Sequence, residues 1–141
     1  MTKYLRASVI LVIGIFSLIG VGCSKKSVKP DGYRRILDKW SWLESWGGIG
    51  GVHLTPESVG YTKTYVFQPN RNFLQYKNDS LISQVEYTIS EKLVWNRDSA
   101  EVLQIQGFLE QIIGFRGDDT LDLMEHVYDG FEHLFVRMND D

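Results

Sequence analysis

The sequence predicts an all-β domain, either a sandwich or a barrel, on three observations. From Gly32 onward, short runs rich in aromatic and β-branched residues alternate with clusters of Gly, Pro, Asn and Asp, a spacing typical of such folds. Helix signals are scarce, because only residues 33–39 could form a turn or two. The single cysteine excludes an intramolecular disulfide, so stability must come from a packed core.

These runs predict eight or nine strands, because neighbouring runs can merge. Their ranges are 39–46, 60–68, 72–78, 83–90, 92–97, 101–106, 108–115, 119–126 and 131–138. Pro69 supplies the fixed φ that begins a turn between the second and third strands, and Asn70 and Asn72 tolerate a positive φ. Further turn sequences lie at 77–80, 116–119 and 128–130.

The long connection at residues 46–60 is rich in glycine. It lacks the Gly-Lys-Ser/Thr sequence of a phosphate-binding loop, so we expect a surface loop. Within this loop, Thr55 is placed to cap one helical turn that begins at Pro56.

The hairpin around Gly130 can adopt two registers. A two-residue loop would pair His126 with His133, whereas a three-residue loop with Gly130 as a bulge pairs Glu125 with His133. The second register collects apolar side chains on one face: Leu121, Leu123, Val127, Phe131 and Phe135. Because a slip of one residue exchanges the two faces of a strand, we expect the bulged loop.

The N-terminus has the pattern of a secretory signal. A basic start precedes a stretch without charged residues from Ala7 to Gly22, which is shorter than a comfortable transmembrane helix. The small residues before Cys23 resemble a bacterial lipobox, with Gly20 where that motif usually has Leu. This resemblance implies cleavage before Cys23 and fatty acylation of its thiol. The alternatives are an uncleaved membrane anchor and a free thiol in a secreted protein.

We therefore expect three segments: a lipoprotein signal peptide at 1–22, a polar tether with lipidated Cys23 at 23–32, and one domain at 33–141. Each buried methylene of an acyl anchor contributes about 0.8 kcal/mol to membrane binding. Without Lys3 and Arg6, the mature chain has 13 basic and 18 acidic residues, a net charge of −5. That charge disfavours nucleic-acid partners, and zinc sites with two or more cysteines are excluded by count.

Motifs across residues 36–138 resemble those of the lipocalins and of bacterial lipocalin-like lipoproteins. The stretch Ile36-Leu37-Asp38-Lys39-Trp40-Ser41-Trp42 opens the first strand and is similar to a Leu-x-Gly-x-Trp start, with Asp38 in place of the glycine. The others are Trp46-Gly47-Gly48, Tyr65-Val66-Phe67, Glu86-Tyr87-Thr88-Ile89, residues 117–123 and Leu134-Phe135-Val136-Arg137. The resemblance implies an eight-stranded, up-and-down antiparallel β-barrel with a short helix and a long first loop. It also implies that Trp40 stacks under Arg137 as a structural pair.

The aromatic side chains are the main candidates for a binding site. One register points inward: Trp40, Trp42, Tyr65, Phe67, Phe73, Tyr87, Trp95 and Phe135. Such residues are usually core, but about eight strands also leave room for one small ligand. We expect the ligand-binding residues to be Trp42, Tyr65, Phe67, Tyr87, His133 and Phe135, and Glu44 and Ser83 to be further polar tips. The sequence leaves open whether the barrel is filled or hollow.

Catalysis and metal binding have little support in the sequence. Glu125 near His133 could orient an imidazole, but no Ser or Cys nucleophile is visibly arranged beside the histidines. Asp118 and Asp119 more simply end a turn, because no EF-hand spacing surrounds them. We expect no catalytic residue, no metal site and no cofactor.

The leading hypothesis is a lipocalin-like lipoprotein of the bacterial cell envelope, anchored by lipid at the outer membrane, that holds a small hydrophobic ligand. The alternative is a filled barrel that serves as a structural or protein-binding module, inhibitor-like in its use of loops, with an envelope protein as partner. An enzyme ranks third.

Overall fold

The computed structural model describes residues 31–95 and 98–139. The predicted signal peptide, Cys23 and most of the predicted tether lie outside these residues. The described helices are α1 (Asp31–Ile36) and α2 (Pro56–Val59), and neither has the length and hydropathy to cross a membrane. The described strands are β1 (Asp38–Gly47), β2 (Val52–Leu54), β3 (Lys63–Phe67), β4 (Asn72–Lys77), β5 (Ser80–Leu93), β6 (Ser99–Ile105), β7 (Gln111–Arg116), β8 (Thr120–Glu125) and β9 (Phe131–Arg137).

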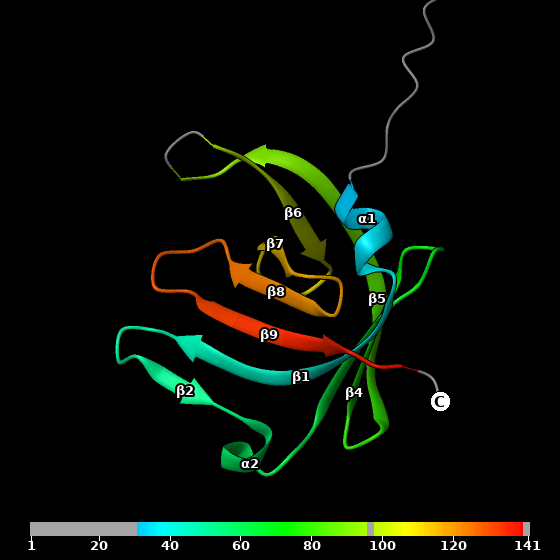
Figure 1. Ribbon diagram of the computed structural model, residues 1–141, viewed down its shortest axis with the longest axis vertical. Coiled ribbons are helices and arrows are strands. Elements are labelled where there is room, and N and C mark those ends of the chain that lie inside the picture. The colour runs from blue at the N-terminus through cyan, green and yellow to red at the C-terminus, as the bar shows by residue number, and fades with distance from the viewer. Residues whose placement is uncertain (1–30, 96–97, 140–141) are drawn as a thin grey trace, which may run out of the picture.

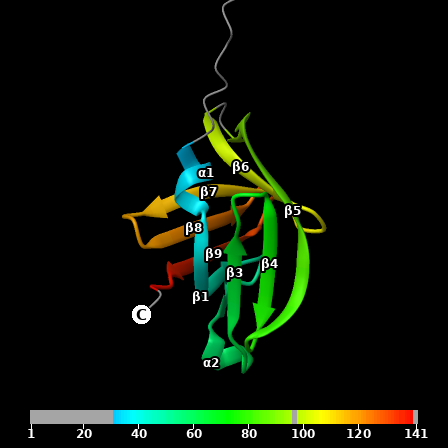
Figure 2. The same ribbon diagram turned by 90° about the vertical axis from the view of Figure 1, so that its right-hand side faces the viewer.

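The strands form one antiparallel sheet that closes on itself (Figures 1 and 2). Neighbours follow the order β2-β1-β3-β4-β5-β6-β7-β8-β9, and β1 also pairs with β9. The first residues of β1 pair with β3 and its last residues pair with β2. The predicted all-β class and the closed eight-stranded antiparallel barrel are therefore confirmed, with β2 as one additional strand.

Most predicted elements are present, and two differ. The runs predicted at 83–90 and 92–97 form one long strand, β5, up to Leu93. β2 lies inside the connection that was expected to be a loop, because Gly48 and Gly51 adopt positive φ and turn the chain back along β1. The predicted helical turn is present as α2, with Thr55 as its N-cap and Pro56 at its start.

The hairpin between β8 and β9 adopts neither expected register. Leu121 pairs with Phe135, and Leu123 pairs with His133, which is two residues away from the bulged register. Asp129 takes the positive φ in place of Gly130, and the connection is correspondingly longer. A slip of two preserves the faces of a strand, so the three apolar side chains of these pairs are fully buried as expected, whereas Val127 is 36% exposed.

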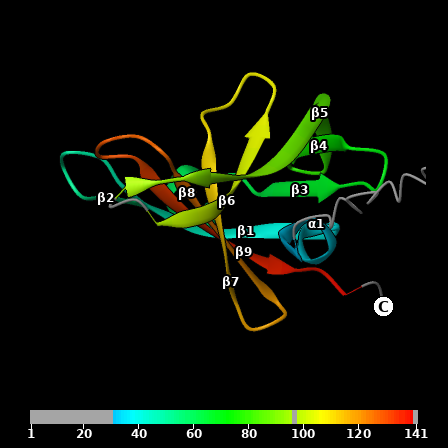
Figure 3. The ribbon, with the colours of Figure 1, turned by 90° about the horizontal axis from the view of Figure 1, so that it is seen from above.

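Helix α1 covers one end of the barrel (Figures 1 and 3). Ile36 is fully buried in the core, and its carbonyl accepts a 2.7 Å hydrogen bond from the indole Nε1 of Trp40. The Tyr33 ring stacks on Tyr87 at 6.4 Å. The β1–β2 turn and the β8–β9 loop lie at the opposite end of the barrel (Figures 1 and 3).

Arg137 connects several elements at the α1 end of the barrel. Its guanidinium lies 4.3 Å from the centroid of the Trp40 ring, so the expected contact is present. Its Nε donates to the Asp118 carbonyl and its Nη2 to the Arg35 carbonyl, each at 3.0 Å. The remaining nitrogen is ion-paired with Asp38. Asp38 is therefore part of this junction.

Candidate functional site

The half of the barrel interior near α1 is filled by an aromatic cluster. Its members are Tyr65, Phe67, Phe73, Tyr87 and Phe135, all buried. Ring centroids lie 4.5 Å apart for Tyr65 and Phe135, 4.8 Å for Tyr65 and Phe73, and 5.2 Å for Phe67 and Tyr87. These are ordinary contact distances for aromatic pairs. Four of the predicted ligand-binding residues therefore contact one another and act as core.

Trp95 does not point inward, and that prediction is wrong. The strand ends at Leu93, and the Trp95 side chain lies 46% exposed with its ring 5.0 Å from His126. It borders a surface hollow of about 270 Å³ with Val127, Tyr128 and Asp129. The physical reason is that β5 extends past the packed interior: Leu93, in the same register and still within the strand, is already 72% exposed.

A bulge in β1 changes which polar side chains enter the barrel. The pairing of β1 with β9 shifts between Trp42 and Glu44. Simple alternation from Trp42 predicts Glu44 inside, but the shift places Ser45 inside, where it is 1% exposed. Glu44 instead forms a 2.8 Å contact with His53 of β2. Ser83, the other polar side chain that was predicted to point into the ligand site, lies half-buried opposite Gln75 of β4.

Away from α1, the interior holds a polar cluster made of Ser45, Lys63, Glu125 and His133. The Trp42 indole donates to Ser45 Oγ at 2.8 Å, and that oxygen lies 2.6 Å from His133 Nδ1. An ionised carboxylate only accepts hydrogen bonds, so a neutral His133 with its proton on Nε2 fits the 3.4 Å contact with Glu125 Oε1. In that tautomer Nδ1 accepts from the Ser45 hydroxyl.

The charges in this cluster are partly desolvated. Burial lowers the pKa of His133, and the Lys63 charge lowers it further, against the opposing effect of Glu125. Burial also lowers the pKa of the Lys63 ammonium, with Glu125 acting in the other direction. The pKa of Tyr65 is raised, first by burial and then by the Glu125 charge. Glu125 itself accepts the backbone N–H of Phe131 at 2.9 Å.

The contacts among Ser45, His133 and Glu125 resemble those of a hydrolase triad. The sequence did not reveal that Ser45 lies beside His133. The Ser45 oxygen, however, is buried and accepts the Trp42 hydrogen bond, so it has no path to a substrate carbon in this arrangement. A nucleophile must reach the reacting atom, and the three residues instead form a partly buried hydrogen-bonded network.

Three residues of this region were not predicted from the sequence: Ser45, Lys63 and Gln111. Gln111 is 4% exposed and lies across from Glu125 in β7–β8, and its Oε1 has no hydrogen-bond partner within the described residues. Lys63 could have been found, because it alternates with Tyr65 and Phe67 along β3.

In the described part of the chain, no three acidic, His or Cys side chains converge as a metal site would require.

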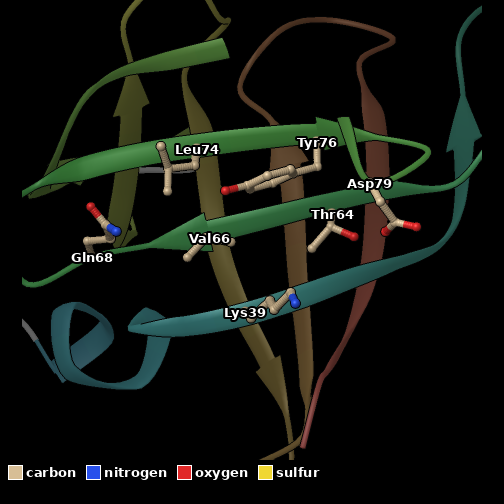
Figure 4. A pocket seen from close by; sticks show the side chains of 7 residues that line it. All are labelled: Lys39, Thr64, Val66, Gln68, Leu74, Tyr76 and Asp79. Carbon is tan, nitrogen blue, oxygen red and sulfur yellow. The ribbon is translucent and has the colours of Figure 1, made fainter. Parts of the chain in front are cut away.

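A separate pocket of about 350 Å³ lies on the outer face of β1, β3 and β4 (Figure 4). Its lining residues are Lys39, Thr64, Val66, Gln68, Leu74, Tyr76 and Asp79. Figure 4 shows the side chains of Thr64, Val66, Leu74 and Tyr76 on one side of β3 and β4. Thr64 and Val66 alternate with the inward Tyr65 and Phe67 along β3. This pocket is therefore outside the barrel and separate from the predicted ligand-binding residues.

Comparisons with protein-family models, curated proteins and solved structures found no significant match. The resemblance to lipocalin-like lipoproteins thus rests on the sequence motifs.

Proposed function

We propose that this chain is a lipid-anchored, lipocalin-like protein of the bacterial cell envelope that binds a small hydrophobic ligand in the half of its barrel away from α1. The observation that carries the proposal is the division of the interior. Aromatic side chains fill the half near α1, whereas Trp42 and Tyr61, stacked at 6.2 Å, adjoin the polar cluster in the other half.

Stability alone gives little reason for such a polar half. An apolar filling would hold the sheet together without desolvating Lys63, His133 and Glu125, and desolvation of charged groups is costly. Polar groups beside an aromatic wall are the usual lining of a small-molecule site, where they fix the orientation of the ligand. His133 and Glu125 keep 17% and 20% side-chain exposure, so solvent reaches this half.

The proposed anchor would orient the barrel. The described chain begins at Asp31 in α1, and the eight residues from Cys23 to Pro30 can span at most about 25–30 Å. An acylated Cys23 would therefore keep the α1 end near the bilayer, and the half with the polar cluster would face away from the membrane.

Two experiments test this proposal. Incorporation of radiolabelled palmitate into the full chain, with Cys23→Ser as control, tests the anchor. The mature chain, residues 23–141 with Cys23→Ser, contains every described strand and can be titrated with the neutral dye N-phenyl-1-naphthylamine. We expect binding that Trp42→Phe weakens and that Trp46→Phe, on the outer face of the same strand, leaves unchanged. Absence of dye binding, together with a native mass spectrum that shows no bound molecule, would contradict the proposal.

A second candidate function is a filled barrel that binds another protein through its loops. The contacts within the aromatic cluster favour it, as do two apolar side chains that are 94% exposed, Ile49 and Tyr128. Such a protein would bind no dye in its interior, and Ile49→Ser with Tyr128→Ser would abolish cross-linking to its envelope partner in intact cells.

A further inference from the structure

Two lysines face each other where β3 and β4 meet. Lys63 pairs directly with Lys77, so both side chains leave the sheet on the same side, the side of Tyr65. Like charges directly opposite in a sheet are destabilising. A pair of this kind therefore needs a compensating interaction.

Aromatic rings provide part of that interaction. The Lys63 ammonium lies 4.4 Å from the Trp42 ring centroid, and the Lys77 ammonium lies 4.2 Å from the Tyr61 ring centroid. Since the two rings stack on each other, the four residues form one unit, the lysine–aromatic cluster (Trp42, Tyr61, Lys63 and Lys77). Cation–π contacts attract the ammonium groups but leave both charges in place.

No carboxylate of residues 31–95 and 98–139 neutralises these charges. Among the described residues, no ion pair within 4.0 Å involves Lys63 or Lys77, whereas Arg116, Arg137 and Lys92 are each ion-paired. Glu125 influences Lys63 only from a greater distance, and its oxygens already contact the Phe131 N–H and His133. Two unneutralised cations thus lie together in a chain whose net charge is −3.

We propose that the lysine–aromatic cluster binds the acidic group of a small ligand whose apolar or aromatic body lies against Trp42 and Tyr61. This inference rests on the proposed function, because it names the class of ligand: a carboxylate, sulfonate or phosphate on an apolar skeleton. An anion between the two ammonium groups removes their mutual repulsion, and the nearby rings exclude water from one side of the contact, which strengthens it.

A pair of related dyes tests the charge requirement. 1-Anilinonaphthalene-8-sulfonate is an anion, and N-phenyl-1-naphthylamine has the same ring skeleton without the charge. Each is titrated into the mature chain with Cys23→Ser and into variants Lys63→Gln and Lys77→Gln. The matched control is Lys39→Gln, an exposed lysine of β1 on the outer face of the barrel.

We expect Lys63→Gln and Lys77→Gln each to weaken binding of the anionic dye by about tenfold, the scale of one well-placed charge contact. Binding of the neutral dye should change less than twofold, and Lys39→Gln should change neither. Lys63→Arg keeps the charge and should keep binding of the anionic dye, which separates loss of charge from loss of folding. Near-ultraviolet circular dichroism checks the fold of each variant.

Two results would overturn the inference, and they differ in meaning. If both dyes bind but the anionic dye binds equally to Lys63→Gln, Lys77→Gln and Lys39→Gln, the lysines do not recognise an anion, while ligand binding in the barrel stands. If neither dye binds the unsubstituted mature chain, the proposed function fails as well.

Discussion

Replacement of Arg137 by Ala should be among the most destabilising changes at a residue that is not fully buried. The cation–π contact with Trp40 contributes about 0.5–2 kcal/mol. Each of the two hydrogen bonds to the Arg35 and Asp118 carbonyls contributes about 1 kcal/mol net, and the partly exposed ion pair with Asp38 at most about 1 kcal/mol. Because one side chain makes all of these contacts, they are not additive, and we expect a loss of about 2–4 kcal/mol.

Thermal and urea unfolding of the mature chain measure this loss. For a domain near 100 residues, 1 kcal/mol shifts the midpoint by about 4–8 °C, so Arg137→Ala should unfold about 10–25 °C earlier. The unfolding midpoint of Arg137→Lys should lie between those of Arg137→Ala and the unsubstituted protein. An ammonium keeps the charge but lacks the planar guanidinium that donates to three acceptors at once.

The matched control is Arg116→Ala. Arg116 is ion-paired with Asp122 and Glu132, but its side chain is 54% exposed, against 24% for Arg137. Its guanidinium donates to these two carboxylates and to no backbone carbonyl, so its midpoint should fall by less than that of Arg137→Ala. If Arg137→Ala and Arg116→Ala unfold at the same temperature, the junction at the α1 end does not stabilise the fold as described.

Three other predictions concern the interior and the β1–β2 turn. Ser45→Ala leaves the buried Trp42 N–H without its acceptor and should cost about 1–3 kcal/mol in urea unfolding; Ser45→Thr, which keeps the hydroxyl, should cost less. Burial lowers the pKa of His133 in the folded chain, so on acidification His133 is protonated in the unfolded chain before it is protonated in the folded chain. The free energy of unfolding should therefore fall as the pH drops through about 6.5, and His133→Gln should flatten this part of the pH profile. Gly47→Ala brings a Cβ to 2.4 Å from the Gly130 carbonyl oxygen and should cost about 1–3 kcal/mol, whereas the same change at Gly51 meets no atom within 4 Å and should cost less in thermal unfolding.

The sequence allowed the fold class and most strands to be predicted, because inward aromatic residues at every second position leave a strong signal. The alternation alone predicts that Trp40, Phe67 and Phe135 point inward, and all three are buried. The β8–β9 register was missed for the same reason: a slip of two residues leaves both faces unchanged, so no pattern of apolar residues distinguishes Leu123 opposite His133 from Leu123 opposite Phe135.

The candidate site was only partly predictable, because it depends on a local irregularity. A bulge adds one residue to a strand and inverts the alternation beyond it, and nothing in the residues around Leu43 marks where this occurs. The inversion exchanges Glu44 for Ser45 inside the barrel. Lys63 follows the ordinary alternation of β3, but a lysine at the end of a strand is usually taken as solvated, and its contact with Trp42 depends on packing across strands.

The wall of the barrel is held together unevenly. β6 and β7 share only the pairs Val102–Ile112 and Leu103–Gln111, fewer than any other neighbours around the closed barrel. Backbone amides on both sides of this seam should exchange with deuterium sooner than those of β1 and β9, since fewer cross-strand bonds must break for it to part. Gln111, with its unmatched oxygen, lies at this seam, so a breathing motion there would admit water first to the polar half of the interior.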